Sequence, residues 1–178
     1  MNPSVLVTGA TNGTGYAIAR RFAQEGYDVV ITSRDHERAC EAALRLSASY
    51  PHVRVWGYGL PAPDETPVIE LFEKLRGHGI LLDTVVLNAA NLGIGMDALT
   101  TPIEDFMAVF HTNIGWNFAT ARQAALMMKE KGGGSIVFIT STTAYRAIPD
   151  RCAYGASKSG ILGLCRALAV DWGKYGIR

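Results

Sequence analysis

The stretch Thr8-Gly9-Ala10-Thr11-Asn12-Gly13-Thr14-Gly15 decides the fold, because it places a glycine-rich turn between a strand-like apolar segment and a helical pattern. Free backbone amides and the positive end of a helix dipole favour a pyrophosphate at such a turn. Gly9 can make the tight turn, Gly13 can let a ligand approach the backbone, and Gly15 can let helix and strand pack closely. The alternative is a glycine-rich turn without a ligand, but its position after the first strand favours a dinucleotide. The residues predicted to bind it here are Gly9, Thr11, Asn12, Gly13, Thr14 and Gly15.

Short β-branched segments alternate with longer segments of helical period on the C-terminal side of this turn. This alternation is typical of βαβ units and a parallel sheet that is covered on both faces. The predicted strands are residues 4–8, 28–33, 53–58, 82–88 and 135–140, and the last two are apolar, as central strands are. The predicted helices are residues 13–25, 35–49, 64–76, 101–131 and 153–172. The fold class is therefore α/β, a Rossmann-like doubly wound parallel sheet in one domain that spans residues 1–178.

The long helix after the fourth strand has a clear start signal. Thr101-Pro102-Ile103-Glu104 offers an N-cap hydroxyl, a proline at the first helical position and a glutamate three residues from the cap. We therefore predict a capping box at Thr101.

Charge and composition exclude several classes of function. The 17 basic and 16 acidic residues leave no electrostatic footprint for nucleic acid or for an acidic membrane surface. No apolar run has the length of a membrane-spanning helix, and Met1-Asn2-Pro3-Ser4 is not a signal-peptide start, so we expect a cytoplasmic protein. Three cysteines without a C-x-x-C pair, and four scattered histidines, predict neither a disulfide framework nor a metal site.

The end of the second strand, Thr32-Ser33-Arg34-Asp35, should meet the ribose of the dinucleotide. An acidic residue at Ser33 would accept hydrogen bonds from a free 2′-hydroxyl, whereas Arg34 can pair with a 2′-phosphate. The sequence therefore favours NADP over NAD, with Ser33 and Arg34 as cofactor-binding residues. The alternative is that Arg34 is a solvated loop residue and Asp35 a helix N-cap.

Tyr154, Lys158 and Ser141 form the second informative pattern. Residues four apart lie on one face of a helix, so the Lys158 ammonium can lie close to the Tyr154 phenol and favour its ionised form. The ordinary pKa of tyrosine is about 10 and must fall by roughly 3 for proton transfer near neutral pH. Taken alone, these residues would be a packing aromatic, an exposed helix residue and a turn residue. Their joint spacing favours a proton-transfer site, in which Thr140, Thr142 or Thr143 could replace Ser141 as the hydroxyl.

Together, these segments resemble the classical branch of the short-chain dehydrogenase/reductase family over essentially the whole chain. The family loop T-G-x-x-x-G-x-G matches Thr8 to Gly15, and its N-A-G-like segment matches Asn88-Ala89-Ala90. The helix asparagine matches Asn113, and the catalytic serine, tyrosine and lysine match Ser141, Tyr154 and Lys158. The chain departs from the family at Gly59-Leu60, which replaces an acidic residue near the adenine, and at Leu87 and Ala90.

The resemblance implies reversible oxidoreduction of a small-molecule carbonyl or alcohol with NADP, or alternatively NAD. It implies that Tyr154 donates the proton, Ser141 binds the same oxygen, Lys158 holds the nicotinamide ribose, and Asn113 extends a proton path through a water. Asn88 and Ala89 would lie beside the cofactor, together with Tyr154 and Lys158. The implied substrates are like those of 3-oxoacyl-carrier-protein reductases or of polyol and sugar dehydrogenases. The implied assembly is a homo-oligomer, a dimer or tetramer, formed through the helices after the fourth and fifth strands.

Other readings remain open at this point. A non-catalytic dinucleotide sensor or scaffold would keep the loop and lack turnover, and an NAD-dependent alcohol dehydrogenase would keep the chemistry. Residues 92–96 and 142–149 are the segments expected to recognise the substrate. The family continues into two more strands and a substrate loop, so we expect that the C-terminal strands are missing after Arg178 and that the fifth strand becomes a sheet edge. A truncated chain, a fragment that pairs with another chain, and a degenerate copy are the three explanations, of which the first is favoured.

Overall fold

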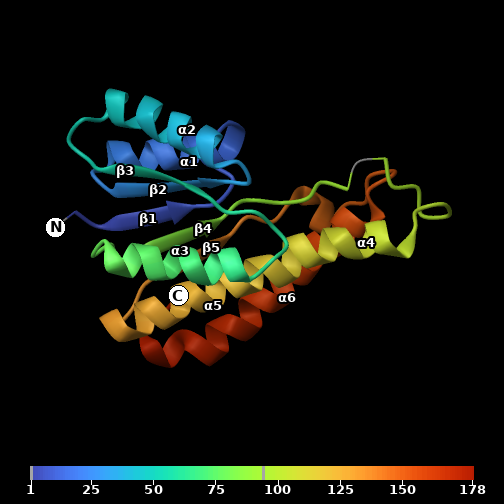
Figure 1. The fold of residues 1–178 in the computed structure, drawn as a ribbon. Coiled ribbons are helices and arrows are strands. Elements are labelled where there is room, and N and C mark those ends of the chain that lie inside the picture. The colour runs from blue at the N-terminus through green and yellow to red at the C-terminus, as the bar shows by residue number, and fades with distance from the viewer. Residues whose placement is uncertain (1, 94) are drawn as a thin grey trace.

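A computed structural model describes residues 2–93 and 95–178, and a five-stranded parallel sheet lies at its centre (Figure 1). The strand order is β3-β2-β1-β4-β5, so the chain crosses over between β3 and β4 and leaves a switch point beside β1. The strands are β1 (Ser4–Val7), β2 (Asp28–Ser33), β3 (Val55–Gly59), β4 (Thr84–Leu87) and β5 (Ser135–Phe138). The predicted fold class is confirmed.

Helices cover both faces of this sheet, with α1 and α2 on one side and α3, α5 and α6 on the other (Figure 1). The α-helices are α1 (Gly13–Gln24), α2 (His36–Ser49), α3 (Thr66–Gly77), α4 (Ile103–Phe110), α5 (Asn117–Lys131) and α6 (Cys152–Trp172). A π-helical segment η1 (His111–Trp116) joins α4 to α5, and the 3-10 turns are η2 (Thr142–Ala144) and η3 (Gly173–Tyr175). The helix α4 extends beyond the carboxyl ends of the strands (Figure 1).

Alternate side chains of β1 enter two separate cores. Val5 and Val7 belong to the core that includes Leu46 of α2, whereas Leu6 belongs to the core that includes Phe72 of α3 and the methionines of α5. All three β1 side chains are fully buried. Burial on both faces of a parallel strand explains why Val5, Leu6 and Val7 are apolar without alternation.

The strand β5 is the last strand in the order among the residues described. Its side chains are mostly half-buried there, and Val137 is 41% exposed. This is the edge position that was expected for the strand. The last residues of the chain pair with it, because Ile136 donates its amide to the Arg178 carbonyl at 2.8 Å and Arg178 donates to Gly134 at 3.1 Å.

The predicted capping box at Thr101 is wrong. The Thr101 hydroxyl donates to the Asp97 carbonyl at 2.6 Å, and the helix α4 begins at Ile103 with Pro102 at the N-cap and no side-chain cap. A capping box would need the Thr101 hydroxyl to bond the first turn of α4, but this hydroxyl is already bonded in the turn before the helix. Glu104 and Asp105 still lie in the first turn, where negative charge complements the helix dipole.

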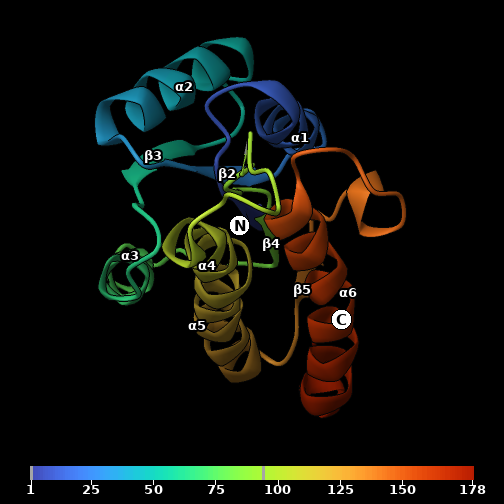
Figure 2. The same cartoon turned by 90° about the vertical axis from the view of Figure 1, so that its right-hand side faces the viewer.

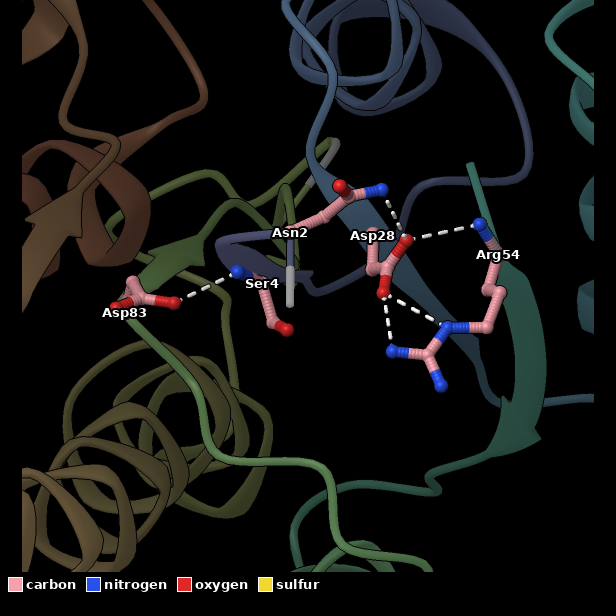
Figure 3. A network of polar contacts seen from close by, with 5 residues as sticks. All are labelled: Asn2, Ser4, Asp28, Arg54 and Asp83. Carbon is pink, nitrogen blue, oxygen red and sulfur yellow. Dashed lines mark hydrogen bonds and ion pairs between the residues drawn. The ribbon is translucent and has the colours of Figure 1, made fainter. Parts of the chain in front are cut away.

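A polar network ties the amino ends of the strands together (Figure 3). The Asp28 side chain is 1% exposed and accepts from the Arg54 guanidinium at 2.9 and 2.6 Å, from the Arg54 amide at 2.9 Å and from Asn2 at 3.2 Å. Beside it, the Ser4 amide donates to Asp83 at 2.7 Å. Burial alone would raise the pKa of Asp28, but the hydrogen bonds and charge of Arg54, with Asn2, hold that pKa below its ordinary value.

Candidate active site

The predicted site residues lie in segments that follow the strands, at the edge of the sheet where all five carboxyl ends meet. A cleft of about 1300 Å³ runs along this edge. It is lined by residues from the phosphate loop, from the ends of β2 and β4, and from α6. The predicted residues that line it are Gly9, Thr11, Asn12, Thr14, Ser33, Arg34, Asn88, Ala89, Tyr154 and Lys158.

The glycines of the phosphate loop adopt conformations that match their predicted structural roles. Gly9 and Gly13 have φ values of +62° and +52°, a region that favours glycine. A Cβ on Gly15 would lie 2.6 Å from both the Asn88 Nδ2 and the Gly9 carbonyl oxygen, so only glycine fits where α1 meets the strand ends. A Cβ on Gly13 would meet nothing within 4 Å, and Asn12 makes no side-chain cap. The first turn of α1 is therefore open to an anionic ligand.

Thr8 is a site residue that sequence reasoning did not select. Its hydroxyl accepts from the amides of Asn88 and Ala89, each at 3.0 Å. The Asn88 side chain returns the contact by donating to the carbonyls of Thr8 at 3.0 Å and Gly9 at 3.1 Å. These four bonds hold the phosphate loop against the end of β4. The available signal was a hydroxyl residue placed directly before the glycine-rich turn.

The end of β2 presents Arg34 to the cleft. Arg34 is exposed and has no ion-pair or side-chain hydrogen-bond partner within residues 2–93 and 95–178. Asp35 caps α2 by accepting from the amides of Glu37 at 2.9 Å and Arg38 at 3.3 Å, so the alternative reading of Asp35 as an N-cap is correct. Arg38, one turn into the helix, also lines the cleft and lies 3.7 Å from Asp35.

Tyr154 and Lys158 meet at the opposite part of the cleft. The Lys158 Nζ lies 5.7 Å from the centroid of the Tyr154 ring, as the four-residue spacing predicts. Lys158 is 2% exposed, and its Nζ donates to the Ile139 carbonyl at the end of β5 at 2.6 Å. Burial lowers the pKa of Lys158 because the interior disfavours the charged ammonium.

Ser141 lies directly before η2, where its Oγ accepts from the Thr143 amide at 3.2 Å. The residue next to it, Thr140, lines the cleft, but the Thr140 hydroxyl donates to the main chain of Lys158 at 2.9 Å. The Thr143 hydroxyl is buried and has no partner among the residues described. The Ser141 Oγ thus accepts a hydrogen bond, and among the residues described its own O–H donates to no acceptor, so this O–H is available to a substrate oxygen.

Asn113 lies in the π-helical segment η1 and is fully buried. Its Oδ1 accepts from the Asn91 amide at 2.7 Å, and its Nδ2 donates to the Asn91 carbonyl and to the Ser157 hydroxyl, each at 2.9 Å. Ser157 in turn donates to the Tyr154 carbonyl at 2.8 Å. The Asn113 side chain thus joins the segment after β4 to the helix that carries Tyr154. Sequence reasoning missed Asn91 and Ser157, although Ser157 stands within the Tyr154 to Lys158 run.

Met1 and Ile94, the latter within the predicted substrate segment 92–96, lie outside the described residues. Within the described part of the chain, no cluster of three or more His, Cys, Asp or Glu side chains could hold a metal ion. The same residues contain no helix that is both long and apolar enough to span a bilayer.

Comparison with known proteins places this geometry in a family. Residues 3–178 match the short chain dehydrogenase family. An uncharacterized oxidoreductase of Thermotoga maritima is 35% identical over 174 residues, which are 98% of this chain and 67% of that protein. Dehydrogenase/reductase SDR family member 4 of Bos taurus is 31% identical, over 99% of this chain and 63% of that protein. A crystal structure of NAD⁺-bound xylitol dehydrogenase superposes with a TM-score of 0.92 at 28% identity and covers 99% of this chain and 67% of that one.

The chain therefore belongs to the short-chain dehydrogenase/reductase family, and the predicted resemblance is confirmed. It spans about two thirds of the length of the relatives it matches. Membership supports the coarse prediction of a dinucleotide-dependent oxidoreductase that acts on small alcohol or carbonyl substrates. The NAD⁺ belongs to the xylitol dehydrogenase structure, and the preference of this chain for NADP stays a prediction.

Proposed function

We propose that the protein is an NADP(H)-dependent oxidoreductase that interconverts a carbonyl and a secondary alcohol, with Tyr154 as the general acid and base. The observation that carries this proposal is the shared cleft, which is lined by the phosphate loop at one part and by Tyr154 and Lys158 at another. A dinucleotide can therefore reach the residues that move the proton. The bound nicotinamide supplies or accepts the hydride.

The chain's own residues would handle the proton. In the reducing direction, Tyr154 donates a proton to the oxygen of the substrate carbonyl, and Ser141 donates a hydrogen bond to the same oxygen. Lys158, whose Nζ lies 5.7 Å from the centroid of the Tyr154 ring, would hold the nicotinamide ribose beside the proton donor. Asn113 would contribute mainly by position, because its side chain fixes the start of α6 through Ser157. A proton path from Asn113 through a water to Lys158 belongs to the same proposal.

The fit between cleft and cofactor rests on charge as well as on shape. Arg34 has no ion-pair partner among the residues described and can pair with a 2′-phosphate, and Arg38 also lines the cleft. The first turn of α1 contains no acidic residue that would repel a pyrophosphate. Leu60 is buried at the cleft where the family usually has an acidic residue, so the adenine would meet an apolar wall.

Substrates like those of 3-oxoacyl-carrier-protein reductases or of polyol and sugar dehydrogenases remain the leading candidates. The xylitol dehydrogenase structure supports the polyol side of this pair, and a 3alpha-hydroxysteroid dehydrogenase that is 28% identical adds steroids to the panel. Acetoacetyl-CoA, D-xylulose and a 3-ketosteroid therefore represent three chemical classes worth testing.

The deciding experiment follows NADPH oxidation with these three carbonyl compounds in the wild type and in Tyr154→Phe. We expect turnover with at least one compound in the wild type and a loss of about 100-fold or more in the variant, since general acid catalysis typically contributes 10²–10⁴. NADPH affinity should be unchanged. Undiminished turnover in Tyr154→Phe would exclude the mechanism, and binding without any turnover would support a dinucleotide sensor instead.

Homo-oligomerisation forms part of the same proposal. Exposed apolar side chains on the helices after β4 and β5 support it, namely Ile103 and Met107 on α4, Leu126 on α5 and Val170 on α6. Light scattering of the purified protein measures the assembly directly, and a monomer at all concentrations would contradict it.

A further inference from the structure

Two segments that are far apart in the sequence are joined beside Tyr154. One follows β4 and contains Leu92, Gly93 and Met96, and the other contains Asp150 and Arg151 before α6 and Cys152 at its first position. Met96 and Arg151 form an isolated parallel β-bridge, and the Met96 amide donates to the Asp150 carbonyl at 3.1 Å. Figure 2 shows the yellow-green segment after β4 converging on the N-terminal end of α6. We call this set of contacts the loop bridge.

Arg151 contributes to the loop bridge with its side chain and its backbone. The Arg151 guanidinium donates to the Leu92 carbonyl at 2.9 Å, and the Arg151 carbonyl accepts from the Gly155 amide at 2.8 Å in the first turn of α6. Leu92 lines the cleft, as does Tyr154. One residue therefore connects a side wall of the cleft to the first turn of the helix that carries the proton donor.

The backbone around Arg151 is strained in a way that the loop bridge stabilises. Asp150 is the one non-glycine residue with a positive φ among the residues described, at +55°. Such a conformation is uncommon for a residue with a Cβ, and it persists where surrounding contacts determine it. The Asp150 carbonyl is the acceptor for Met96, so the strained peptide makes a contact of the bridge.

The other side of the loop bridge is equally constrained. Gly93 has a φ of +51°, and a Cβ at this position would lie 3.1 Å from the Met96 sulfur and 3.1 Å from Val109 of α4. Cys152 adds a weak contact from its thiol to the Met96 carbonyl at 3.8 Å. Met96 is thus held by contacts on several sides, including the backbone bridge to Arg151, while the Arg151 guanidinium holds the neighbouring Leu92.

We propose that Arg151 is a positioning residue that holds Leu92 and Met96 in register with Tyr154, and so fixes the substrate side of the cleft. This inference rests on the proposed function for its kinetic part. The phosphate loop makes none of these contacts, so the effect of Arg151 falls on the carbonyl substrate and not on the dinucleotide.

The test compares Arg151→Gln with Arg151→Lys and with Arg166→Gln, which changes an exposed arginine on α6. For the best carbonyl of the panel, we expect Arg151→Gln to raise KM roughly tenfold, the scale of one lost charge-assisted hydrogen bond. The dissociation constant of NADPH should not change. Arg151→Lys keeps a donor and should recover part of the loss, and Arg166→Gln should behave as the wild type.

Hydrogen exchange at the Met96 amide gives a readout that does not depend on turnover. Exchange at this amide should accelerate in Arg151→Gln and remain slow in Asp150→Gly, because glycine accepts the positive φ without strain. Unchanged Met96 exchange in Arg151→Gln, or an equal loss of NADPH affinity, would overturn the proposal. If the wild type turns over no carbonyl, the proposed function fails, and Met96 exchange alone decides whether Arg151 maintains the loop bridge.

Discussion

Lys158 illustrates at the scale of one residue how a functional group works against stability. Its ammonium is almost fully removed from water, and one backbone carbonyl at 2.6 Å is its hydrogen-bond partner among the described residues. Burying a charge without an opposite charge is costly, which is why the pKa of Lys158 is lowered. A residue retained in such a position is a candidate for function.

This cost predicts a pH dependence of stability. The folded pKa of Lys158 lies below the ordinary 10.5, so between these two values the unfolded chain holds more protons and the free energy of unfolding rises with pH. Lys158→Met removes this contribution. We expect the stability of the wild type to rise relative to Lys158→Met as the pH rises towards 10.5, measured by urea unfolding of both proteins. A difference between the two proteins that stays constant with pH would contradict the lowered pKa, and turnover should be lost in the variant.

The predicted preference for NADP over NAD depends on Arg34. Replacing Arg34 by alanine should weaken NADPH binding about tenfold or more, since a charge-assisted contact to a phosphate contributes roughly 1.5–3 kcal/mol. NADH binding should hardly change, because NADH lacks the 2′-phosphate. Fluorescence titration with both dinucleotides measures the two affinities, and the exposed Arg20 of α1 offers an alanine control. Equal losses for both dinucleotides would favour the NAD-dependent alternative.

At the scale of elements, η1 is the part of the fold that the sequence did not reveal. The chain from α4 to α5 runs as a continuous helix, as predicted, but six residues of it are π-helical. A π-helical turn shifts the register of the residues that follow it, and such turns often mark functional positions. Here η1 brings Asn113 between the segment after β4 and α6, and its side-chain amide makes two hydrogen bonds to Asn91 and one to Ser157.

The contacts of Asn113 predict a combined structural and catalytic defect. Asn113→Ala removes three hydrogen bonds and leaves buried partners unsatisfied, which should cost about 2–4 kcal/mol of unfolding free energy. The start of α6 should also lose its anchor at Ser157, so turnover should fall more than NADPH affinity. Thermal unfolding and steady-state kinetics measure these effects, with Gln123→Ala of α5 as the control. A variant with wild-type stability would show that the network does not hold α6.

These elements also show what could be predicted from sequence. The strand β2 has the predicted bounds, and Gly9, Gly15, Tyr154 and Lys158 lie as expected, because turn geometry and helical spacing are local properties. The partners of Asn113 and Thr8, and the exposure of each β5 side chain, depend on contacts between distant segments. An apolar strand has the same pattern at the centre or the edge of a sheet, and a hydroxyl such as that of Thr101 can choose among nearby acceptors.

At the scale of the whole molecule, the side of the sheet where the strands end and the side where they begin have different roles. The carboxyl edge holds the cleft, whereas the amino edge holds the network of Asp28, Arg54 and Asn2 (Figure 3). The network joins the N-terminal segment, β2 and the residue before β3, and its carboxylate is buried. Mutations at the amino edge should therefore change stability and leave the cleft intact.

The lowered pKa of Asp28 gives this edge a measurable signature. A carboxylate whose folded pKa lies below its unfolded value, near 3.8, stabilises the fold above that value, and this contribution is lost as the pH falls through the folded pKa. We expect the free energy of unfolding to drop between pH 5 and pH 2 more steeply in the wild type than in Asp28→Asn, measured by urea unfolding. Arg54→Met should be destabilised by about 1–3 kcal/mol at pH 7, since the buried carboxylate keeps the residue-54 amide and Asn2 but loses the guanidinium.

The same Arg54→Met variant tests the cause of the shift as well as its size. Without the guanidinium, burial works against ionisation of Asp28 with less opposition, so the folded pKa moves upward and protonation in acid becomes less costly to the fold. The acid-induced loss of stability should therefore be smaller in Arg54→Met than in the wild type, although the variant is less stable at pH 7. NADPH affinity at pH 7 should match the wild type in both variants, because the cleft lies at the other edge of the sheet. A steeper acid transition in Arg54→Met would show that Arg54 is not what keeps Asp28 ionised.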